Sequence, residues 1–325
     1  MKKVLGQIVK LFLLLFAISI ITFALMKIAP IDPVASYLGA DSNVTTEQYE
    51  YLTKVWGLDR PILTQYLSWI KGVFRGDMGN SFAYHKPVFE LISNASANTF
   101  MLMFTSWILS GILGFVLGLI SAAHRGKLTD HIIQKICYVF ASIPTFWFAI
   151  LMLLLFAVQL GWFPAGMSAP IGMLEEDISV FDRIHHMILP AVTLSILGIS
   201  KITLHTREKL IEALGSEYFL YAKANGESLR GAIRRHGLRN IVLPAITIQF
   251  GSISELFGGS VLVENVFSYA GLGNMTKVAG VKGDLPLLLA ITLVSAIFVF
   301  GGNLCANLLY PVVDPRIREG VYNDR

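Results

Sequence analysis

Apolar segments and polar loops alternate along the chain. Six apolar segments cover about residues 9–28, 99–122, 133–160, 187–205, 241–267 and 286–310. Each is long enough for an α-helix that crosses the roughly 30 Å hydrocarbon core of a bilayer. The third and fifth segments are long enough to tilt or to include an interfacial turn. The pattern therefore predicts an all-α integral membrane protein with six transmembrane helices.

The longest polar stretch lies between the first two apolar segments, over residues 30–98. It carries seven acidic and five basic residues, too many charges for a bilayer crossing. Within it, apolar residues at helical spacing predict amphipathic helices over residues 46–56 and 61–74, and Gly-Asp-Met-Gly at 76–79 predicts a turn. This stretch is expected to form a module on one side of the membrane.

The charge distribution indicates which side that is. The chain is 54% hydrophobic and 15% charged, with a net charge of +4. Of its 26 Lys and Arg residues, sixteen lie in the termini, the loop around Arg125 and residues 206–240, whereas the three opposite loops hold eight. Because positive charge gathers on the cytoplasmic side, both termini are predicted to be cytoplasmic.

These observations predict the order of the domains. The first apolar segment has no convincing cleavage site and is interpreted as a retained membrane anchor. The expected parts are an N-terminal transmembrane helix (1–29), an extracytoplasmic module (30–98), a five-helix core (99–312) with a cytoplasmic loop (206–240), and a cytoplasmic C-terminal tail (313–325).

A polar, basic block over residues 217–244 interrupts the apolar second half of the chain. Its first residues predict a short helix that Gly226 ends, and Ser228 is positioned to cap a second short helix rich in arginine. Ala222, Ala224 and Gly226 are small, which would let a partner surface approach the backbone closely. The block is expected to form a compact knob outside the membrane.

The fifth apolar segment contains polar and small residues near its middle. Ser252, Glu255, Gly258 and Gly259 are spaced so that they share one broad helix face. A charge at this depth is costly and usually faces a cavity or a partner. This face is therefore a candidate lining of a translocation path. The alternative is that Glu255 makes a structural hydrogen bond to a neighbouring helix.

Other polar and bending residues in the apolar segments have simpler interpretations. Lys201 lies toward the cytoplasmic end of the fourth segment, where a lysine side chain extends to the interface as readily as it serves a function. Pro144, Pro190 and Pro244 are expected to bend the helices that contain them or to allow close helix contact. A transporter that switches between two packings could use such bends.

Catalytic and metal-binding motifs are absent from the sequence. It contains no Walker-type phosphate loop, GxSxG, HExxH or dinucleotide fingerprint, which indicates that the chain is not an enzyme. His185 and His186 lie beside acidic residues, but adjacent residues on a helix point to different faces and chelate poorly. No metal site is predicted.

Several motifs resemble one family of membrane proteins. Ala-x-Ala-x-Gly at 222–226, followed by a basic helix and Leu-Arg-Asn-x-x-Leu-Pro at 238–244, resembles the cytoplasmic coupling loop of ATP-binding-cassette (ABC) importer permeases. Leu-Asp-Arg-Pro at 58–61 and the 76–79 turn match the external module of the dipeptide, oligopeptide and nickel importer permeases in order. The chain departs from the family at Ala270, where proline is usual, and at Asn225, where a basic residue is common.

The resemblance implies a type I ABC importer permease that moves peptides, nickel or metal chelates by alternating access. The family's coupling loop docks on an ATPase, which assigns docking to Glu217, Tyr218, Ala222, Lys223, Ala224, Gly226, Arg234, Arg235 and Arg239. The implied partners are a homologous permease, two ATPase subunits and an extracytoplasmic substrate-binding protein. ATP and Mg²⁺ would be bound by the ATPases and no cofactor by this chain. The location would be a bacterial or archaeal cytoplasmic membrane.

A second class of function stays open from the sequence. An ion-coupled secondary transporter could use Glu255 and Lys201 as a coupling site, although no inverted repeat is evident. A protein that needs an ATPase and one that transports with a proton gradient alone are distinguishable by what copurifies with the chain.

Overall fold

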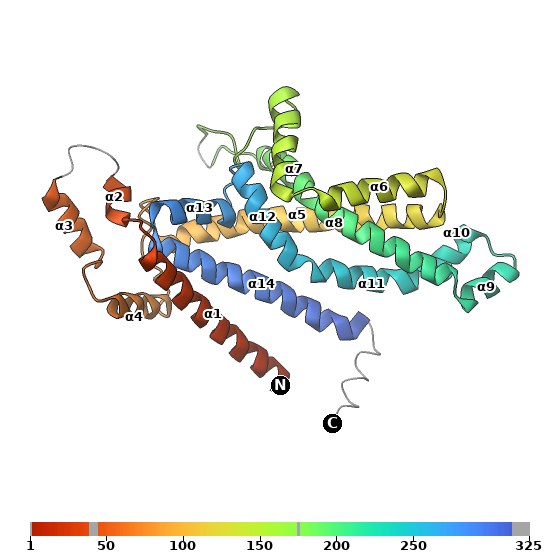
Figure 1. Ribbon diagram of the computed structural model, residues 1–325, viewed down its shortest axis with the longest axis horizontal. Helices are drawn as coiled ribbons and strands as arrows, with labels where there is room; N and C mark the ends of the chain where they lie inside the picture. Colours follow the sequence, from red (N-terminus) through yellow and green to blue (C-terminus); the bar gives the residue numbers. More distant parts are fainter. Residues whose placement is uncertain (1, 39–44, 174–175, 314–325) are drawn as a thin grey trace. The chain divides into compact units, whose positions relative to one another are not determined.

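The computed structural model describes residues 2–38, 45–173 and 176–313, and the regular elements among them are all helices (Figure 1). The chain divides into two compact units. The first comprises residues 1–99 and 270–300, and the second comprises residues 100–269 and 301–325. Two long helices, α5 (Val88–Ala123) and α14 (Leu285–Val313), begin in the first unit and end in the second.

Four described helices are long and apolar enough to cross a membrane. They are α1 (Lys2–Ile28), α5, α8 (Val180–Leu214) and α14. Two bent pairs raise the number of candidate spans to six if each pair is one span: α6 (Leu128–Ser142) with α7 (Thr145–Met152) and the π-helical turn η1 (Leu153–Gln159), and α11 (Leu238–Gly251) with α12 (Ile253–Val266). The protein is therefore an all-helical membrane protein with four to six candidate spans in its described part.

Only one of the three prolines breaks its helix. The chain bends by 106° between α6 and α7, where Ile143 is extended and Pro144 precedes the first residue of α7, because proline disfavours a helical residue before it. Pro190 and Pro244 lie inside α8 and α11, which continue past them. The second break, of 49°, falls at Ser252 instead.

The first unit contains the polar stretch that follows α1. Its helices are α2 (Pro33–Leu38), α3 (Thr46–Val55) and α4 (Ile62–Val73), so both predicted amphipathic helices are confirmed. The predicted turn is confirmed by positive φ angles at Gly76 and Gly79. The core joins the first turns of α5 to α13 (Leu272–Lys282) and α14 through the buried side chains of Val88, Ile92, Leu272 and Leu287.

A buried carboxylate fixes the start of α14. Asp284 accepts hydrogen bonds from the Ser81 hydroxyl at 2.5 Å, the Ala83 N–H at 2.9 Å and the Leu287 N–H at 3.2 Å. The last of these caps the helix. Burial raises the pKa of Asp284 above its ordinary value, although the hydrogen bonds act in the opposite direction. This contact links the loop before α5 to the first turn of α14.

In the second unit, α5 and α8 pack with almost no space between their backbones. A Cβ atom on Gly114 would lie 2.8 Å from Cβ of Ile202, and one on Gly118 would lie 2.6 Å from Cβ of Thr206. The Thr203 hydroxyl donates to the Gly114 carbonyl at 3.2 Å. Small residues every fourth position are the usual means by which membrane helices approach closely.

Candidate functional site

The coupling-loop region begins where α8 ends and returns to the membrane through α11. The first helix is α9 (Glu217–Ala224), as predicted. Gly226 has φ +81°, and the Glu227 N–H donates to the Ala222 carbonyl at 3.1 Å. This is the Schellman ending of a helix, in which a left-handed residue turns the chain. The prediction that Gly226 ends the helix is confirmed.

The second half of the loop differs from the expected short helix. Ser228 caps the next helix as predicted, because its hydroxyl accepts the Gly231 N–H at 3.2 Å. That helix, α10 (Leu229–Ala232), runs through a π-helical turn, η2 (Ile233–Gly237), into α11 without a gap. The basic segment is therefore the beginning of the fifth apolar helix rather than a separate element. Movement of the loop would be passed directly along this continuous helix.

The loop has a small core of its own. Phe219, Ala222 and Ala232 are buried together, with Leu214 and Ile233 packed against them. Ala222 therefore packs inside the loop and does not offer its side chain to a partner. Ala224 and Gly226 are exposed.

The outer face of α9 includes two apolar residues that sequence reasoning missed. Leu220 and Tyr221 are largely exposed, and they share this face with Glu217 and Ala224, which lie three to four residues away. The sequence signal for this face was the presence of Leu220 and Tyr221, two large apolar residues, in an otherwise polar block. The face combines one acid with exposed apolar surface, a composition suited to protein contact.

The remaining predicted docking residues are basic or aromatic, and the structure describes the side chains of only two of them. Arg234 and Arg235 are exposed, and the Arg235 guanidinium contacts the Glu227 carboxylate at 2.8 Å. The side chains of Tyr218, Lys223 and Arg239 fall outside the part of the chain that the structure describes.

The predicted intramembrane face divides into two sides. Ser252 and Gly259 are buried, and a Cβ atom on Gly259 would lie 3.0 Å from the Leu194 side chain in α8. Glu255 and Gly258 are exposed. The Glu255 carboxylate accepts from Lys201 Nζ at 2.6 Å, and the two side chains are 61% and 53% exposed. Glu255 therefore does contact a neighbouring helix, and its partner is Lys201 in α8.

The depth of this ion pair makes its exposure significant. Glu255 lies 14 residues after Ile241 and 11 residues before Val266, the ends of the bent candidate span formed by α11 and α12. It is therefore near the middle of a candidate span rather than at an interface. Charges exposed at this depth face a water-filled cavity or another protein surface, because hydrocarbon disfavours them strongly.

A second ion pair on α8 is buried. The Arg207 guanidinium donates from two nitrogens to Asp130 in α6, at 2.6 and 2.8 Å. Asp130 also accepts the Ser121 hydroxyl at 2.6 Å, the Gly126 N–H at 2.9 Å and the Gln134 amide at 2.9 Å. This carboxylate therefore joins the end of α5, the following turn, α6 and α8. Sequence reasoning did not identify this role for Asp130.

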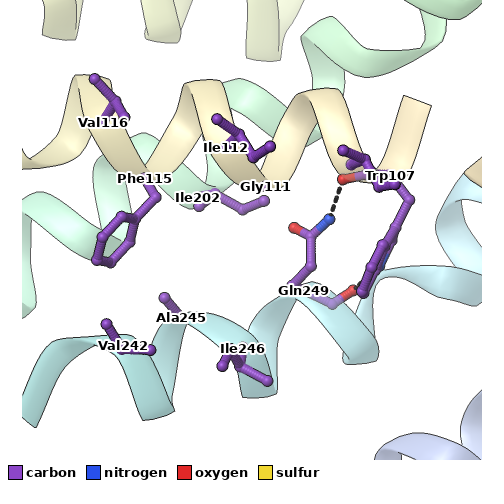
Figure 2. Close-up of a pocket in the computed structure, with 11 residues that line it drawn as sticks. Trp107, Gly111, Ile112, Phe115, Val116, Ile202, Val242, Ala245, Ile246 and Gln249 are labelled. Atoms are coloured by element: carbon purple, nitrogen blue, oxygen red, sulfur yellow. Dashed lines mark hydrogen bonds between the residues drawn. The ribbon is translucent and has the colours of Figure 1, made fainter. Parts of the chain in front are cut away.

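Figure 2 shows a groove between α5, α8 and α11 with a volume of about 430 Å³. Its lining is apolar apart from Gln249, which sequence reasoning also missed. The Gln249 amide donates to the Trp107 carbonyl, and the Trp107 indole donates to the Gln249 carbonyl at 2.9 Å. The sequence signal for Gln249 was the presence of a side-chain amide inside an apolar segment. The reciprocal bonds tie α11 to α5, and the apolar remainder suits contact with hydrocarbon.

Long apolar helices, a hinged polar loop after α8 and a charged pair at mid-span together define a multi-pass membrane transport subunit. Family comparison makes this definite. The profile of the binding-protein-dependent transport system inner membrane component matches residues 114–319, and the N-terminal profile of the same membrane components matches residues 1–103. The chain belongs to this family. It is a permease subunit of the inner membrane and not a catalytic subunit.

Individual relatives match over nearly the whole chain. The oligopeptide transport system permease protein AppB of Bacillus subtilis is 37% identical over 305 residues, covering 94% of this chain and 95% of that protein. The di/tripeptide transport system permease protein DppB of Pseudomonas aeruginosa is 29% identical over 319 residues, with 94% and 95% covered. A crystal structure of the MetNI methionine ABC transporter, facing inward, shares the fold with a TM-score of 0.57 at 16% identity, covering 70% of this chain and 97% of that chain.

Proposed function

We propose that this chain is one of two membrane-spanning subunits of an ATP-driven peptide importer, coupled to ATPase subunits through α9. The observation that carries the proposal is the exposed face of α9, where Leu220 and Tyr221 lie on a loop that leads directly into α11. Exposed apolar side chains on a polar cytoplasmic loop suit a docking surface better than a solvated one.

The proposed topology has six spans in the arrangement of type I ABC importers. Each bent pair then counts as one span, so that both termini and residues 206–240 are cytoplasmic and residues 30–98 precede the core on the outside. The excess of Lys and Arg in the cytoplasmic segments supports this orientation. The C-terminal tail, residues 314–325, lies outside the described residues.

The proposed mechanism is alternating access. An external binding protein delivers substrate, ATP and Mg²⁺ are held by two ATPase subunits, and closure of the ATPases pushes α9. Because α10, η2 and α11 form one uninterrupted helix, displacement of the loop is transmitted into the membrane. A second, homologous permease would complete the path.

The proposed path is lined by the exposed side of α12, where Glu255 pairs with Lys201. An exposed charged pair at mid-span needs water or protein around it, and a path between two permeases supplies both. Ser252 and Gly259 would act behind this surface by letting α12 pack on α8. A secondary transporter could use the same pair for ion coupling, but it would not need the exposed face of α9.

The proposed substrates are peptides. AppB and DppB carry oligopeptide and di/tripeptide transport in their names, and this chain aligns with nearly their full length. These names favour peptides over the nickel or metal chelates that the sequence left open. Selection among peptides would rest largely on the external binding protein.

The test removes one aromatic ring from α9 and one from elsewhere. Tyr221→Ser is compared with Tyr51→Ser in α3, because the two residues are similarly exposed, at 72% and 67%. Tagged permease complexes are purified to measure retained ATPase, and ATP-dependent peptide uptake is measured in proteoliposomes. We expect Tyr221→Ser to lose ATPase and uptake together, while Tyr51→Ser retains both. Full ATPase retention by Tyr221→Ser would remove α9 from the docking surface, and uptake driven by a proton gradient without ATPase would favour the secondary transporter.

A further inference from the structure

Helix α4 packs on the first membrane span through one of its sides. Tyr66 is buried, and with Trp69 and Ile70 it contacts Phe23 of α1 and Leu289 of α14. The helix lies within the polar stretch of residues 30–98, which composition alone places outside the bilayer. Its contacts therefore decide where it lies.

The rest of the α4 surface is divided into two stripes. Leu63, Leu67 and Phe74 are exposed and lie on one line, because they are four and seven residues apart. A second exposed stripe, next to the first, is polar and basic and is formed by Thr64, Ser68, Lys71 and Arg75. Large apolar side chains in a continuous exposed row require a covering partner, and the adjacent polar row limits what that partner is.

The contact with α1 shows the depth of α4. The Tyr66 hydroxyl is 2.8 Å from the Ser19 hydroxyl, and the Tyr66 ring lies 6.4 Å from the Phe16 ring. Ser19 is nine residues before Ile28, the last residue of α1, or about 14 Å along the helix. Half the hydrocarbon core is about 15 Å thick. The side of α4 that packs on α1 therefore reaches well into the leaflet that surrounds the C-terminal half of this span.

We infer that α4 is a membrane-inserted helix whose exposed apolar stripe binds lipid acyl chains. Leu63, Leu67 and Phe74 would lie among the acyl chains beside the exposed Phe16, continuous with the apolar surface of α1. Lys71 and Arg75 would lie at the level of the headgroups, where basic side chains favour anionic lipid. The lipid contact explains why the two exposed stripes differ in polarity although neither is covered by described residues of the chain.

The experiment compares neighbouring residues of the two stripes in the complete transporter, reconstituted in phosphatidylglycerol-containing nanodiscs without the binding protein. Cys137 and Cys305 are first replaced by alanine. Nitroxide labels are then placed at Leu67→Cys and, as the matched control, at Ser68→Cys. Collisions with oxygen, which partitions into lipid, and with a water-soluble nickel chelate are measured by electron paramagnetic resonance. We expect a several-fold higher ratio of oxygen to nickel collisions at position 67 than at position 68.

Two results would overturn the inference. Equal, nickel-dominated collisions at both positions would mean that the stripe faces water and awaits the binding protein. Low collision rates with both reagents at position 67 would mean that a protein subunit covers it. If Leu67→Cys does not yield folded protein, Phe74→Cys is read against Arg75→Cys with the same criteria, because these residues repeat the apolar and polar stripes at the other end of α4.

Discussion

Two ion pairs on one helix differ in how far their carboxylates are buried. Lys201 and Arg207 are six residues apart on α8, and each binds a carboxylate from another helix. Asp130 is 1% exposed and accepts five hydrogen bonds from its surroundings. Glu255 is 61% exposed and is paired with Lys201 at 2.6 Å. The first pair has no room to exchange partners, whereas the second can exchange them without unfolding anything.

The energetic consequences of the two arrangements are opposite. Removing one partner of a buried pair leaves an uncompensated buried charge, and this typically costs about 3–5 kcal/mol. Removing one partner of an exposed pair costs about 1 kcal/mol or less in water. In the proposed mechanism, α8 would combine a fixed contact at Arg207 with a changeable contact at Lys201. Four predictions test this contrast.

The largest effect is expected from Asp130→Asn. The substitution preserves shape but leaves Arg207 without its counter-charge. Because the Arg207 side chain is 20% exposed, the free energy of unfolding should fall by about 3 kcal/mol, the low end of the range for a buried pair. Thermal unfolding of the purified permease in detergent measures this loss. Glu255→Gln, which makes the same chemical change at the exposed pair, is the control and should unfold close to wild type. Equal destabilisation by both variants would break the comparison.

The second effect concerns transport rather than stability. Glu255→Gln should lose most ATP-driven uptake with the ATPase still bound, because the α9 surface is unchanged. The exchanged pair Lys201→Glu with Glu255→Lys distinguishes two explanations. If the pair only joins α8 to α12, the exchange should restore uptake. If the proposed path depends on where each charge lies, it should not, and normal uptake by the exchanged pair would assign these residues to packing.

The sequence was most informative where the signal is local. Apolar length placed the long helices, and the glycine at 226 and the serine at 228 marked the ends of the loop helices, because each depends only on neighbouring residues. The bend before α7 was also readable, since Pro144 restricts the residue that precedes it. The bend at Ser252 was not predicted, although Gly251 and Ser252 form a Gly/Ser pair, which is a common site of helix kinks.

The sequence did not predict which charged residues pair, because the partners are far apart in the chain. Glu255 was recognised as unusual because it lies in apolar sequence, but Lys201 is 54 residues away and had a simpler interpretation at the helix end. Arg207 and Asp130 are 77 residues apart. The apolar outer face of α9 was hidden because Ala222, chosen for its small size, turned out to be packed inside the loop. Which side of a short helix faces inward depends on the returning chain.

A smaller effect is expected at the hinge that follows the Arg207 end of α8. Gly226 has φ +81°, and no atom lies within 4 Å of where its Cβ would be, so strain comes from the backbone alone. Gly226→Val should therefore cost about 1–3 kcal/mol locally and reduce coupling of ATP hydrolysis to uptake in proteoliposomes. Gly226→Asn is the matched control and should remain close to wild type, because asparagine tolerates this conformation. Similar coupling in both variants would mean that the left-handed turn has no part in transmission.

The smallest effect is expected from the exposed arginines of the loop. Like Lys201 they are exposed charges, but they lie on a surface in water. Arg234 and Arg235 are both exposed, and Arg235 already contacts Glu227.

An exposed ion pair contributes ~0.2–1 kcal/mol, so Arg234→Gln should weaken ATPase binding by at most about fivefold. Since the Debye length falls from about 8 Å at 0.15 M salt to about 3 Å at 1 M, wild type at high salt should approach the variant at low salt. The Kd of the ATPase for reconstituted permease, measured across this salt range, decides the matter, with Lys86→Gln in the first unit as a control. A loss in Arg234→Gln that high salt leaves unchanged would mean that this arginine is buried on docking, like Arg207, and would move it to the anchoring side of the comparison.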